Sequence, residues 1–537
     1  MPCDEYVSPW KPGWREAIQG RLDRKWDIII VGGGITGAGI LAIASKSGMK
    51  TLLLEKEDFS SGTSSRSSKL VHGGLRYLKH MHIKLTRDSV RERQRMLREA
   101  QGLVEPLGFI YPLYHGDKPS PWLVEIGLGV YTHLSSDAGE YTRLDSVDLT
   151  MLAPGLKQRG LEQGYYYTDA RTDDARLVLR VIHDGLLWGK SRCAALNYCQ
   201  VTGLLEKNER VVGVRIRDER RGEEAEIKGS VVINATGAWS DRLRSEVGGR
   251  PRLRPIRGSH LFFSRRRFPV YQAVAFTHPE DRRPVFVFPW EGITLVGTTD
   301  VDHHQSLDTQ PSISEEEAEY LLQAVRFYFP ELSLSRSDVL TTQAGVRPVV
   351  ATGKKDPSAE SREHTLWNDK GLLTVTGGKL TTFRVIALDA LREAHNINKS
   401  LNEPHTRASV FSRVSPSPLP GVDPFFSQRL YGRYGAAAPS IIKENPHLLS
   451  KAGKTPYLWA EIAWSLENEA VEHLDDLLLR RFRLGILLED GGQELFPQLK
   501  KLCKERLGWQ EVRWVEEKER FQKIWQEGYL PPPSWRS

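Results

Sequence analysis

The chain has 537 residues, of which 39% are hydrophobic and 27% are charged. At about 150 residues per domain, this length and composition predict two to four domains of an ordinary globular protein. No stretch approaches the roughly 18 uninterrupted apolar residues of a membrane-spanning helix. The first residues also lack the apolar core and cleavage site of a signal peptide. We therefore expect a protein that stays on the cytoplasmic side of the membrane.

The net charge of +7 is unevenly distributed along the chain. Residues 62–100 contain ten Lys or Arg against three Asp or Glu, and residues 242–267 contain nine Arg against one acid. Such blocks can meet nucleic acid, an anionic membrane or an anionic substrate, but a solvated surface explains them equally well. No aromatic stacking platform or nucleic-acid module accompanies them, so we expect no nucleic-acid binding.

The cysteines predict a reducing compartment. They are too few and too scattered for a disulfide framework or a zinc site: Cys3, Cys193, Cys199 and Cys503. Packing in the hydrophobic core explains Cys193 and Cys199 better than a disulfide or a metal site does. We expect no bound metal.

In chain order, the first predicted elements form a nucleotide-binding unit. Residues 1–26 are a lead-in with a short helix over Trp14–Leu22, and the apolar run Asp27–Val31 is typical of a strand buried in a parallel sheet. The sequence GGGITG then opens an apolar helix that stops at Gly48. A second strand, TLLLE, ends at Glu55.

Each residue of this fingerprint has a physical task. Gly32 allows the tight turn, Gly34 lets a pyrophosphate approach the backbone, and Gly37 lets the helix pack closely on the strand. The helix N-terminus offers amide donors and positive potential to a phosphate. Glu55 stands where a carboxylate accepts both hydroxyls of an adenosine ribose. The whole strand–turn–helix–strand–acid arrangement predicts a dinucleotide site.

Two later turns favour FAD over NAD as that dinucleotide. VVINATGAW (231–239) is an apolar strand that ends at Ala235, Thr236 and Gly237, similar to the second dinucleotide-contacting turn of flavoproteins. LLTVTGGKLTT (372–382) is a strand followed by two glycines and a helix that begins near Thr381. A helix N-terminus there stabilises negative charge on a flavin as it is reduced.

The rest of the chain divides by pattern. Strands and helices alternate to about residue 395, with a second β-rich stretch over about 250–350. Residues 396–420 are polar and contain proline, which predicts a linker. Residues 421–537 are predicted to be helical, because Leu474, Leu478 and Phe482 recur on one face with Leu477 beside them. Asp173 and Asp174 precede ARLVL and are better explained as helix N-cap residues than as paired catalytic carboxylates.

Several longer motifs together resemble one family. They are GTSSRSSKLVHGGLRYL (62–78), YTDARTDDARLVL (167–179), RGSHLFF (257–263), VGTTD (296–300), AGVRP (344–348), GGKLTTFR (377–384) and EAVEHLDDLLLRRFRLG (469–485). These motifs are similar to those of the FAD-dependent glycerol-3-phosphate dehydrogenases, the aerobic, quinone-linked enzymes. The resemblance runs from about Trp14 to about residue 490, and the predicted linker and the last residues match nothing in it.

The resemblance implies a mixed α/β fold. A Rossmann-type FAD-binding domain is interleaved with a β-sheet substrate domain over residues 27–395, and an all-helical domain follows over 421–537. The expected FAD-binding parts are about 27–100, 165–245 and 345–395, and the expected substrate-domain parts are about 101–164 and 246–344.

The implied activity is oxidation of sn-glycerol 3-phosphate to dihydroxyacetone phosphate, with hydride transfer to a non-covalent FAD and electrons passed to a membrane quinone. The nearest alternative is an oxidase of the same family that reduces oxygen to peroxide. Those relatives carry a longer middle region, and none is visible between residues 300 and 345. An amine or amino-acid oxidase is disfavoured, because several pocket cations suit a phosphate better than one carboxylate.

Candidate substrate residues follow from the phosphate dianion, which needs convergent cations. Arg76, Arg347 and Lys379 each sit just past glycines. By the resemblance, Arg76, Tyr77 and Lys379 bind the phosphate or the hydroxyls, and Arg347 orients the substrate. His260 is the candidate general base, because an imidazole takes a proton near neutral pH.

The resemblance also assigns cofactor contacts. They fall on the glycine fingerprint, on the run of hydroxyls after the βαβ unit and on the later turns: Gly32, Gly34, Gly37, Glu55, Thr63, Ser64, Ser65, Ser68, Lys69, Val201, Ala235, Gly237, Gly378, Leu380 and Thr381. The hydroxyl run would look similar in a solvated loop. We expect His72 to form no covalent bond to the flavin.

One segment bears on whether the protein attaches to a membrane. PWLVEIGLGVYTHL (121–134) places Trp122, Ile126 and Val130 on one helical face, with Gly129 and His133. It is too short to span a bilayer, but it suits burial in the membrane interface, and a buried core helix explains it about as well. With the resemblance, it predicts peripheral attachment to the inner face of the cell membrane. The expected partners are glycerol 3-phosphate, a membrane quinone, an anionic membrane surface and, as one option, a second copy in a homodimer.

Overall fold

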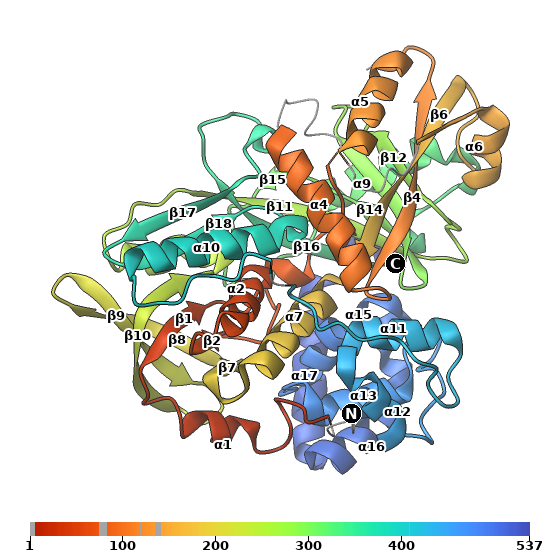
Figure 1. Cartoon of the computed structure of the whole chain (residues 1–537). Helices are drawn as coiled ribbons and strands as arrows, with labels where there is room; N and C mark the ends of the chain where they lie inside the picture. Colours follow the sequence, from red (N-terminus) through yellow and green to blue (C-terminus); the bar gives the residue numbers. More distant parts are fainter. Residues whose placement is uncertain (1–5, 75–82, 119, 135–140, 408, 537) are drawn as a thin grey trace.

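The computed structural model describes residues 6–74, 83–118, 120–134, 141–407 and 409–536. The strands form two β-sheets, which we name sheet A and sheet B; in Figure 1 sheet B lies above the C-terminal helices and sheet A lies to the left of them. The predicted fold class, mixed α/β with an appended helical region, is confirmed.

Sheet A has a parallel centre that pairs in the order β18, β10, β1, β2 and β7. Its strands are β1 (Trp26–Val31), β2 (Thr51–Leu54), β7 (Cys193–Leu196), β8 (Cys199–Lys207), β9 (Arg210–Asp218), β10 (Glu223–Asn234), β17 (His364–Asp369) and β18 (Leu372–Gly377). β17 joins the β18 edge antiparallel, and β8 and β9 extend β10 as an antiparallel meander.

Both faces of sheet A are covered, which explains why its central strands are continuously apolar. Ile28 and Ile30 pack on one face against α2 (Ile35–Lys46), α7 (Asp174–Gly189) and α10 (Phe383–Ile397). Ile29 and Val31 point to the other face, where the β8–β9 meander covers them. The expected helix near Thr381 begins as a 3₁₀ turn, η7 (Leu380–Thr382), and continues as α10.

Sheet B is antiparallel apart from the β12–β4 pair. Its strands are β3 (Leu70–Val71), β4 (Val104–Tyr114), β5 (Thr142–Leu144), β6 (Leu161–Thr172), β11 (Leu253–Ser264), β12 (Ala273–Thr277), β13 (Pro284–Trp290), β14 (Ile293–Gly297), β15 (Val301–Asp302) and β16 (Val339–Val350). β6 and β16 continue past the predicted domain borders at residues 164 and 344, because β6 pairs along its whole length with β4, and β16 with β11.

Further helices around the sheets, among the described residues, are α1 (Trp14–Gln19), α4 (Ile83–Glu99), α5 (Pro121–His133), α6 (Ser146–Leu152) and α8 (Ser240–Ser245). α9 (Glu315–Tyr328) packs on one face of sheet B. α1 is shorter than the predicted Trp14–Leu22, because turns replace the helix after Gln19. Within the described residues, no helix is long and apolar enough to cross a membrane.

The C-terminal helices are α11 (Pro424–Tyr434), α12 (Ala438–Glu444), α13 (Trp459–Asn468), α14 (Leu474–Asp476), α15 (Leu484–Leu487), α16 (Phe496–Leu507) and α17 (Glu511–Gly528). The periodic residues Leu474, Leu478 and Phe482 are fully buried, in a core that the helices share with sheet B. A π-helical turn, Leu477–Arg481, interrupts the helix there.

The expected linker over 396–420 is packed rather than free. α10 runs to Ile397, and the described residues from 398 to 423 form no helix or strand. Val410 and Phe411 are buried in the core beneath sheet A. The Ser412 N–H donates to Asp184 of α7 at 2.7 Å. This contact ties the segment to the sheet-A layer.

Candidate functional site

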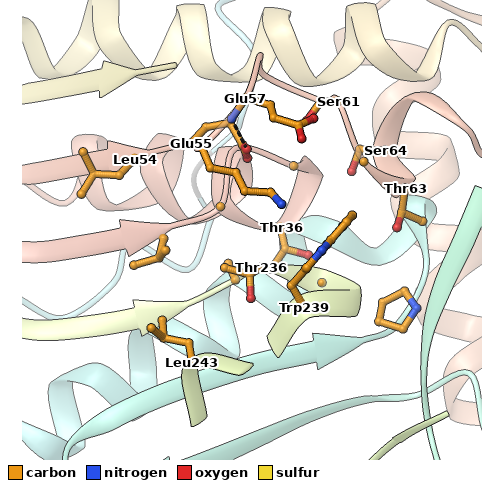
Figure 2. A pocket seen from close by; sticks show the side chains of 18 of the residues that line it. Thr36, Leu54, Glu55, Glu57, Ser61, Thr63, Ser64, Thr236, Trp239 and Leu243 are labelled. Atoms are coloured by element: carbon orange, nitrogen blue, oxygen red, sulfur yellow. Dashed lines mark hydrogen bonds between the residues drawn. The ribbon is translucent and has the colours of Figure 1, made fainter. Parts of the chain in front are cut away.

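A cavity of about 870 Å³ opens at the carboxyl ends of β1 and β2. Ligand sites reach roughly 300–1,000 Å³, so this one is large enough for an extended dinucleotide. Figure 2 shows Glu55 and Ser64 among the side chains that line it, with Thr236 and Trp239 across from them. Ligands of open α/β sheets bind outside the carboxyl ends of the strands.

The glycine turn after β1 leaves no space for side chains. Gly32 has φ +114°, and a Cβ there would lie 2.5 Å from the Ala235 carbonyl oxygen. A Cβ on Gly37 would lie 2.0 Å from the Gly32 oxygen, so this glycine lets α2 approach the turn. Gly34 is the N-cap of α2, and a Cβ there would lie 2.9 Å from Ser64 Oγ. The turn therefore presents bare backbone to the cavity.

Glu55 faces the cavity at the end of β2. Its carboxylate accepts the Gly33 N–H at 2.7 Å and the Glu57 N–H at 3.0 Å. Burial raises the pKa of Glu55 to about 7, although these two donors favour the ionised form. The carboxylate thus braces the glycine turn as well as facing the place expected for a ribose.

Of the residues assigned to the cofactor or substrate, most line this cavity: Gly32, Gly34, Glu55, Thr63, Ser64, Val201, Ala235, Gly237, Gly378, Lys379 and Leu380. Others are not among the lining residues: Gly37, Ser65, Ser68, Lys69, Thr381, His260 and Arg347. Arg76 and Tyr77 lie outside the described residues. Contact with FAD stays a prediction for each of them.

The hydroxyl run is ordered into a wall of the cavity. Thr63 Oγ1 donates to the Val346 carbonyl of β16 at 2.6 Å. The Ile35 N–H, in the first turn of α2, donates to Ser64 Oγ at 2.9 Å. Lys69 is fully buried beneath this run and donates to Gln343 Oε1 at 3.0 Å. Lys69 therefore supports the wall from behind.

Three cations gather near the Lys379 end of the cavity. Arg347, on β16, bonds to Asp300 and donates to Thr298 Oγ1 at 3.0 Å. Arg362 donates to both oxygens of the same Asp300 at 3.2 Å. Burial, followed by the charge of Arg362, lowers the pKa of Lys379 to about 7. Burial is the larger cause, and the charge of Arg362 adds to it.

His260 is completely buried on β11. Its Nε2 lies 2.9 Å from the hydroxyl of Ser68, a partly exposed residue. Burial, and then the charges of Lys69 and Arg347, hold the pKa of His260 well below its usual value. The imidazole is therefore neutral at physiological pH, in the form that can accept a proton.

Asp173 is the N-cap of α7 and accepts the Arg176 N–H at 3.3 Å, as expected. Asp174 is the first residue of the helix. Both carboxylates also take part in a buried ion network with Arg483.

Sequence reasoning missed Trp239, Lys56 and Arg362. Trp239 follows the ATG turn directly and lines the cavity, so its position after that motif was a usable signal. Lys56 lines the cavity and lies over the Trp239 ring at 4.8 Å. Arg362 lies in a polar loop with no motif, and its contact with Asp300 is visible only in three dimensions.

Cavity and fold together define a dinucleotide-dependent oxidoreductase, and comparison with known proteins agrees. The profile of the family described as FAD dependent oxidoreductase matches residues 27–384. The profile described as C-terminal domain of alpha-glycerophosphate oxidase matches residues 391–514. The aerobic glycerol-3-phosphate dehydrogenase of Staphylococcus haemolyticus is 34% identical over 497 residues, which cover 87% of this chain and 88% of that protein.

Solved structures of related proteins share the fold of this chain. The glycerol-3-phosphate dehydrogenase from Bacillus halodurans complexed with FAD aligns with a TM-score of 0.76 at 26% identity, covering 97% of this chain and 98% of that one. The L-alpha-glycerophosphate oxidase from Mycoplasma pneumoniae shares the fold, with a TM-score of 0.56 at 18% identity over 69% of this chain and 95% of that one. The chain belongs to the FAD-dependent glycerol-3-phosphate dehydrogenase family, and FAD is its cofactor.

The residues at the cavity fit FAD held without a covalent bond. Bare glycine backbone and the α2 N-terminus suit a pyrophosphate, and Glu55 suits a ribose. We predict that the purified protein has the visible absorbance of a flavin, and that heat or acid releases it as free FAD, measured by chromatography. Flavin that stays with the precipitated protein would contradict the non-covalent assignment.

Proposed function

We propose that this protein oxidises sn-glycerol 3-phosphate to dihydroxyacetone phosphate and passes the electrons to a membrane quinone. The observation that carries the proposal is the group of cations at one part of the FAD cavity, where Lys379 lines the cavity and Arg347 and Arg362 share the single carboxylate of Asp300. A phosphate dianion neutralises such a corner, and arginine forks bind its oxygens well. An uncharged alcohol would leave the excess charge in place.

The chain's residues divide the work. Lys379, which lines the cavity, binds the phosphate, while Arg362 and Arg347 add positive potential through their shared partner Asp300. This contact holds the secondary carbon of the substrate toward the cavity. When bound, FAD supplies the acceptor for the hydride that leaves this carbon. The neutral His260 takes the hydroxyl proton through Ser68, because its Nε2 already bonds to that hydroxyl. Loss of this proton and the hydride turns the alcohol into a ketone, and the phosphate is unchanged.

The pKa of Lys379 gives a pH prediction. In the free enzyme its ammonium loses its proton as the pH rises through about 7, so affinity for the substrate phosphate should weaken above that pH. Bound phosphate raises the lysine pKa, and binding should therefore take up a proton. Lys379→Arg stays charged and should flatten this fall, whereas Lys379→Ala should lower kcat/KM by roughly ten- to a hundredfold.

The measurement is kcat/KM for glycerol 3-phosphate across pH 6 to 9 in the three proteins, with FAD content checked in each. Indistinguishable wild-type and Lys379→Arg profiles would remove Lys379 from the phosphate site.

A second prediction concerns the base. His260→Gln keeps the size of the side chain but cannot accept a proton at neutral pH, so kcat should fall by roughly a hundredfold or more, with KM nearly unchanged. Part of this loss should be recovered at high pH, where hydroxide replaces the base. Equal falls in kcat at pH 7 and pH 9 would argue against His260 as the base.

The electron acceptor is inferred from one exposed surface. On α5, Val124, Leu128 and Tyr131 are buried, which leaves the opposite side of the helix in solvent. That side is apolar: Trp122 is 64% exposed, Ile126 55%, Leu123 46% and Val130 45%. It supports attachment to a bilayer interface, where a lipid-soluble quinone is available. α5 is thus neither a wholly buried core helix nor a spanning one.

The basic block 242–267 is weaker evidence for binding to an anionic membrane than its sequence suggests. Five of its arginines form ion pairs with acids of this chain, namely Arg242, Arg244, Arg254, Arg257 and Arg267. Attachment should therefore depend mainly on apolar contact at α5. Oxygen as the acceptor is the alternative, and the likeness to the oxidase C-terminal domain supports it.

We predict that the protein sediments with liposomes and that detergent, more than salt, releases it. Trp122→Glu with Ile126→Glu should leave it in the supernatant, while glycerol 3-phosphate still reduces its flavin. Val512→Glu with Val515→Glu, on the exposed side of α17, is the matched control and should change neither property. Reduced wild-type flavin should be reoxidised faster by a short-chain quinone than by oxygen. Faster reoxidation by oxygen, without liposome binding, would replace this proposal with a soluble oxidase.

A further inference from the structure

The segment between β2 and β3, residues 55–69, forms much of the cavity wall. We name it the cofactor loop. Nine of its residues line the cavity: Glu55, Lys56, Glu57, Ser60, Ser61, Gly62, Thr63, Ser64 and Ser67. Its only regular structure is the 3₁₀ turn Thr63–Ser65. Because sheet hydrogen bonds hold little of this loop, its shape depends on contacts with other parts of the chain.

The first such contact joins the loop to the C-terminal helices at Asp58. This carboxylate is fully buried and accepts hydrogen bonds from Arg480 and from the two terminal nitrogens, Nη1 and Nη2, of Arg481, the longer at 2.9 Å. Asn197 adds a donor at 3.2 Å. Removal of either arginine would leave a buried negative charge with too few partners.

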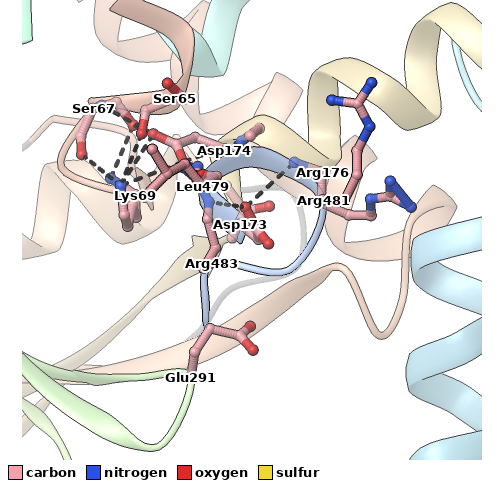
Figure 3. Close-up of polar contacts among 12 residues, drawn as sticks. Ser65, Ser67, Lys69, Asp173, Asp174, Arg176, Glu291, Leu479, Arg481 and Arg483 are labelled. Carbon is pink, nitrogen blue, oxygen red and sulfur yellow. Dashed lines mark hydrogen bonds and ion pairs between the residues drawn. The ribbon is translucent and has the colours of Figure 1, made fainter. Parts of the chain in front are cut away.

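The second contact reaches the loop at Ser67, through α7. Arg483 donates to Asp173 Oδ1 at 3.0 Å and also bonds to Asp174 (Figure 3). Asp174 Oδ2 in turn accepts the Ser67 N–H at 2.9 Å and the Ser67 hydroxyl at 2.7 Å. Arg483 and the two aspartates are buried, so water does not weaken these bonds.

From Ser67 the contacts continue to the candidate base. Lys69 lies 3.4 Å from Asp174 and donates to Gln343, the residue that faces His260 across the β11–β16 pair. Ser68, between Ser67 and Lys69, bonds to His260. A shift of Asp174 would therefore move both the cavity wall and the neighbours of His260.

The local backbone turns the arginines toward the loop. The π-helical turn Leu477–Arg481 ends with the Phe482 N–H bonded to the Leu477 oxygen at 3.0 Å. Arg483 then adopts the left-handed conformation, with φ 54°. Leu477 and Phe482 are buried in the C-terminal core, while the arginines point to the acids of the oxidoreductase region. π-helical turns often mark functional positions.

We propose that Arg483 is a positioning residue of the FAD site. Acting through Asp174, it fixes Ser67 and hence the wall of the cavity, while Arg480 and Arg481 fix the other end of the cofactor loop at Asp58. Apolar residues would join the two parts of the chain as firmly, but they lack the directional bonds that set the position of Ser67. The inference rests on the assignment of FAD to this cavity.

The test compares Arg483→Gln with a matched control, Arg429→Gln. Arg429 is also a buried arginine of the C-terminal helices, and it pairs with Glu291 of the oxidoreductase region without touching residues 55–69. FAD is removed from each protein and titrated back, with the dissociation constant read from flavin fluorescence. Arg483→Gln should bind FAD roughly ten- to thirtyfold more weakly than wild type, and Arg429→Gln within about twofold of it.

Two further readouts separate positioning from general stability. The visible circular dichroism of bound flavin should change in Arg483→Gln and not in Arg429→Gln. In the FAD-free proteins, peptides covering residues 55–69 should exchange amide hydrogen faster only in Arg483→Gln. Should this variant fail to fold, the charge-balanced pair Arg483→Gln with Asp174→Asn replaces it, against Arg429→Gln with Glu291→Gln as control.

Equal FAD affinity and equal exchange in the Arg483 and Arg429 variants would overturn the inference and leave the proposed function intact. A wild-type protein that binds no FAD would overturn the assignment of the cavity instead.

Discussion

The close contact between the α2 helix and the glycine turn is the constraint on which the rest of this structure depends. A Cβ at Gly37 would lie 2.0 Å from the Gly32 oxygen, and a Cβ at Gly32 would lie 2.5 Å from the Ala235 oxygen. Strand β1, helix α2 and the turn after β10 therefore meet at bare backbone. That meeting opens the cavity at the sheet edge, and every later feature of the site is placed around it.

Charge then divides this cavity into regions. Glu55 lines the cavity and is held by backbone donors, whereas Lys379 lines it near Arg362, which shares Asp300 with Arg347. Asp300 binds both arginines, which orients them without cancelling the whole positive charge. The neutral His260 behind this corner is a consequence of the same charges, because Lys69 and Arg347 add to the effect of burial. An anionic alcohol is the substrate that such a division favours.

The nucleotide-binding unit could be predicted from sequence because its signals are local. Strand, glycines and helix follow one another within thirty residues, and each has its own pattern. The cation corner was only partly predictable, since Arg362 reaches it through Asp300 from a loop without a motif. The surroundings of Lys69 were also only partly predictable. Its place next to the hydroxyl run predicts a cofactor contact, and in the structure its side chain is buried against Asp174 and Gln343.

The C-terminal arginines illustrate the same limit. In the sequence, Arg480, Arg481 and Arg483 lie in a helical tail and carry no sign of their partners, which are some 300 to 420 residues earlier. Helix periodicity correctly predicted that Phe482 is buried, but it could not show the π-helical turn that directs its neighbours toward Asp58 and Asp174. Long-range ion pairs of this kind depend on the complete fold.

The central claim is that glycerol 3-phosphate gives its hydride to FAD in this cavity. The most direct measurement mixes the purified protein with sn-glycerol 3-phosphate in the absence of oxygen and follows the visible absorbance of the flavin. We predict that glycerol 3-phosphate bleaches the flavin and that the same concentration of glycerol, which lacks the phosphate, has little effect. A flavin that keeps its absorbance with glycerol 3-phosphate, or that glycerol bleaches equally fast, would contradict hydride transfer from a phosphorylated substrate in this cavity.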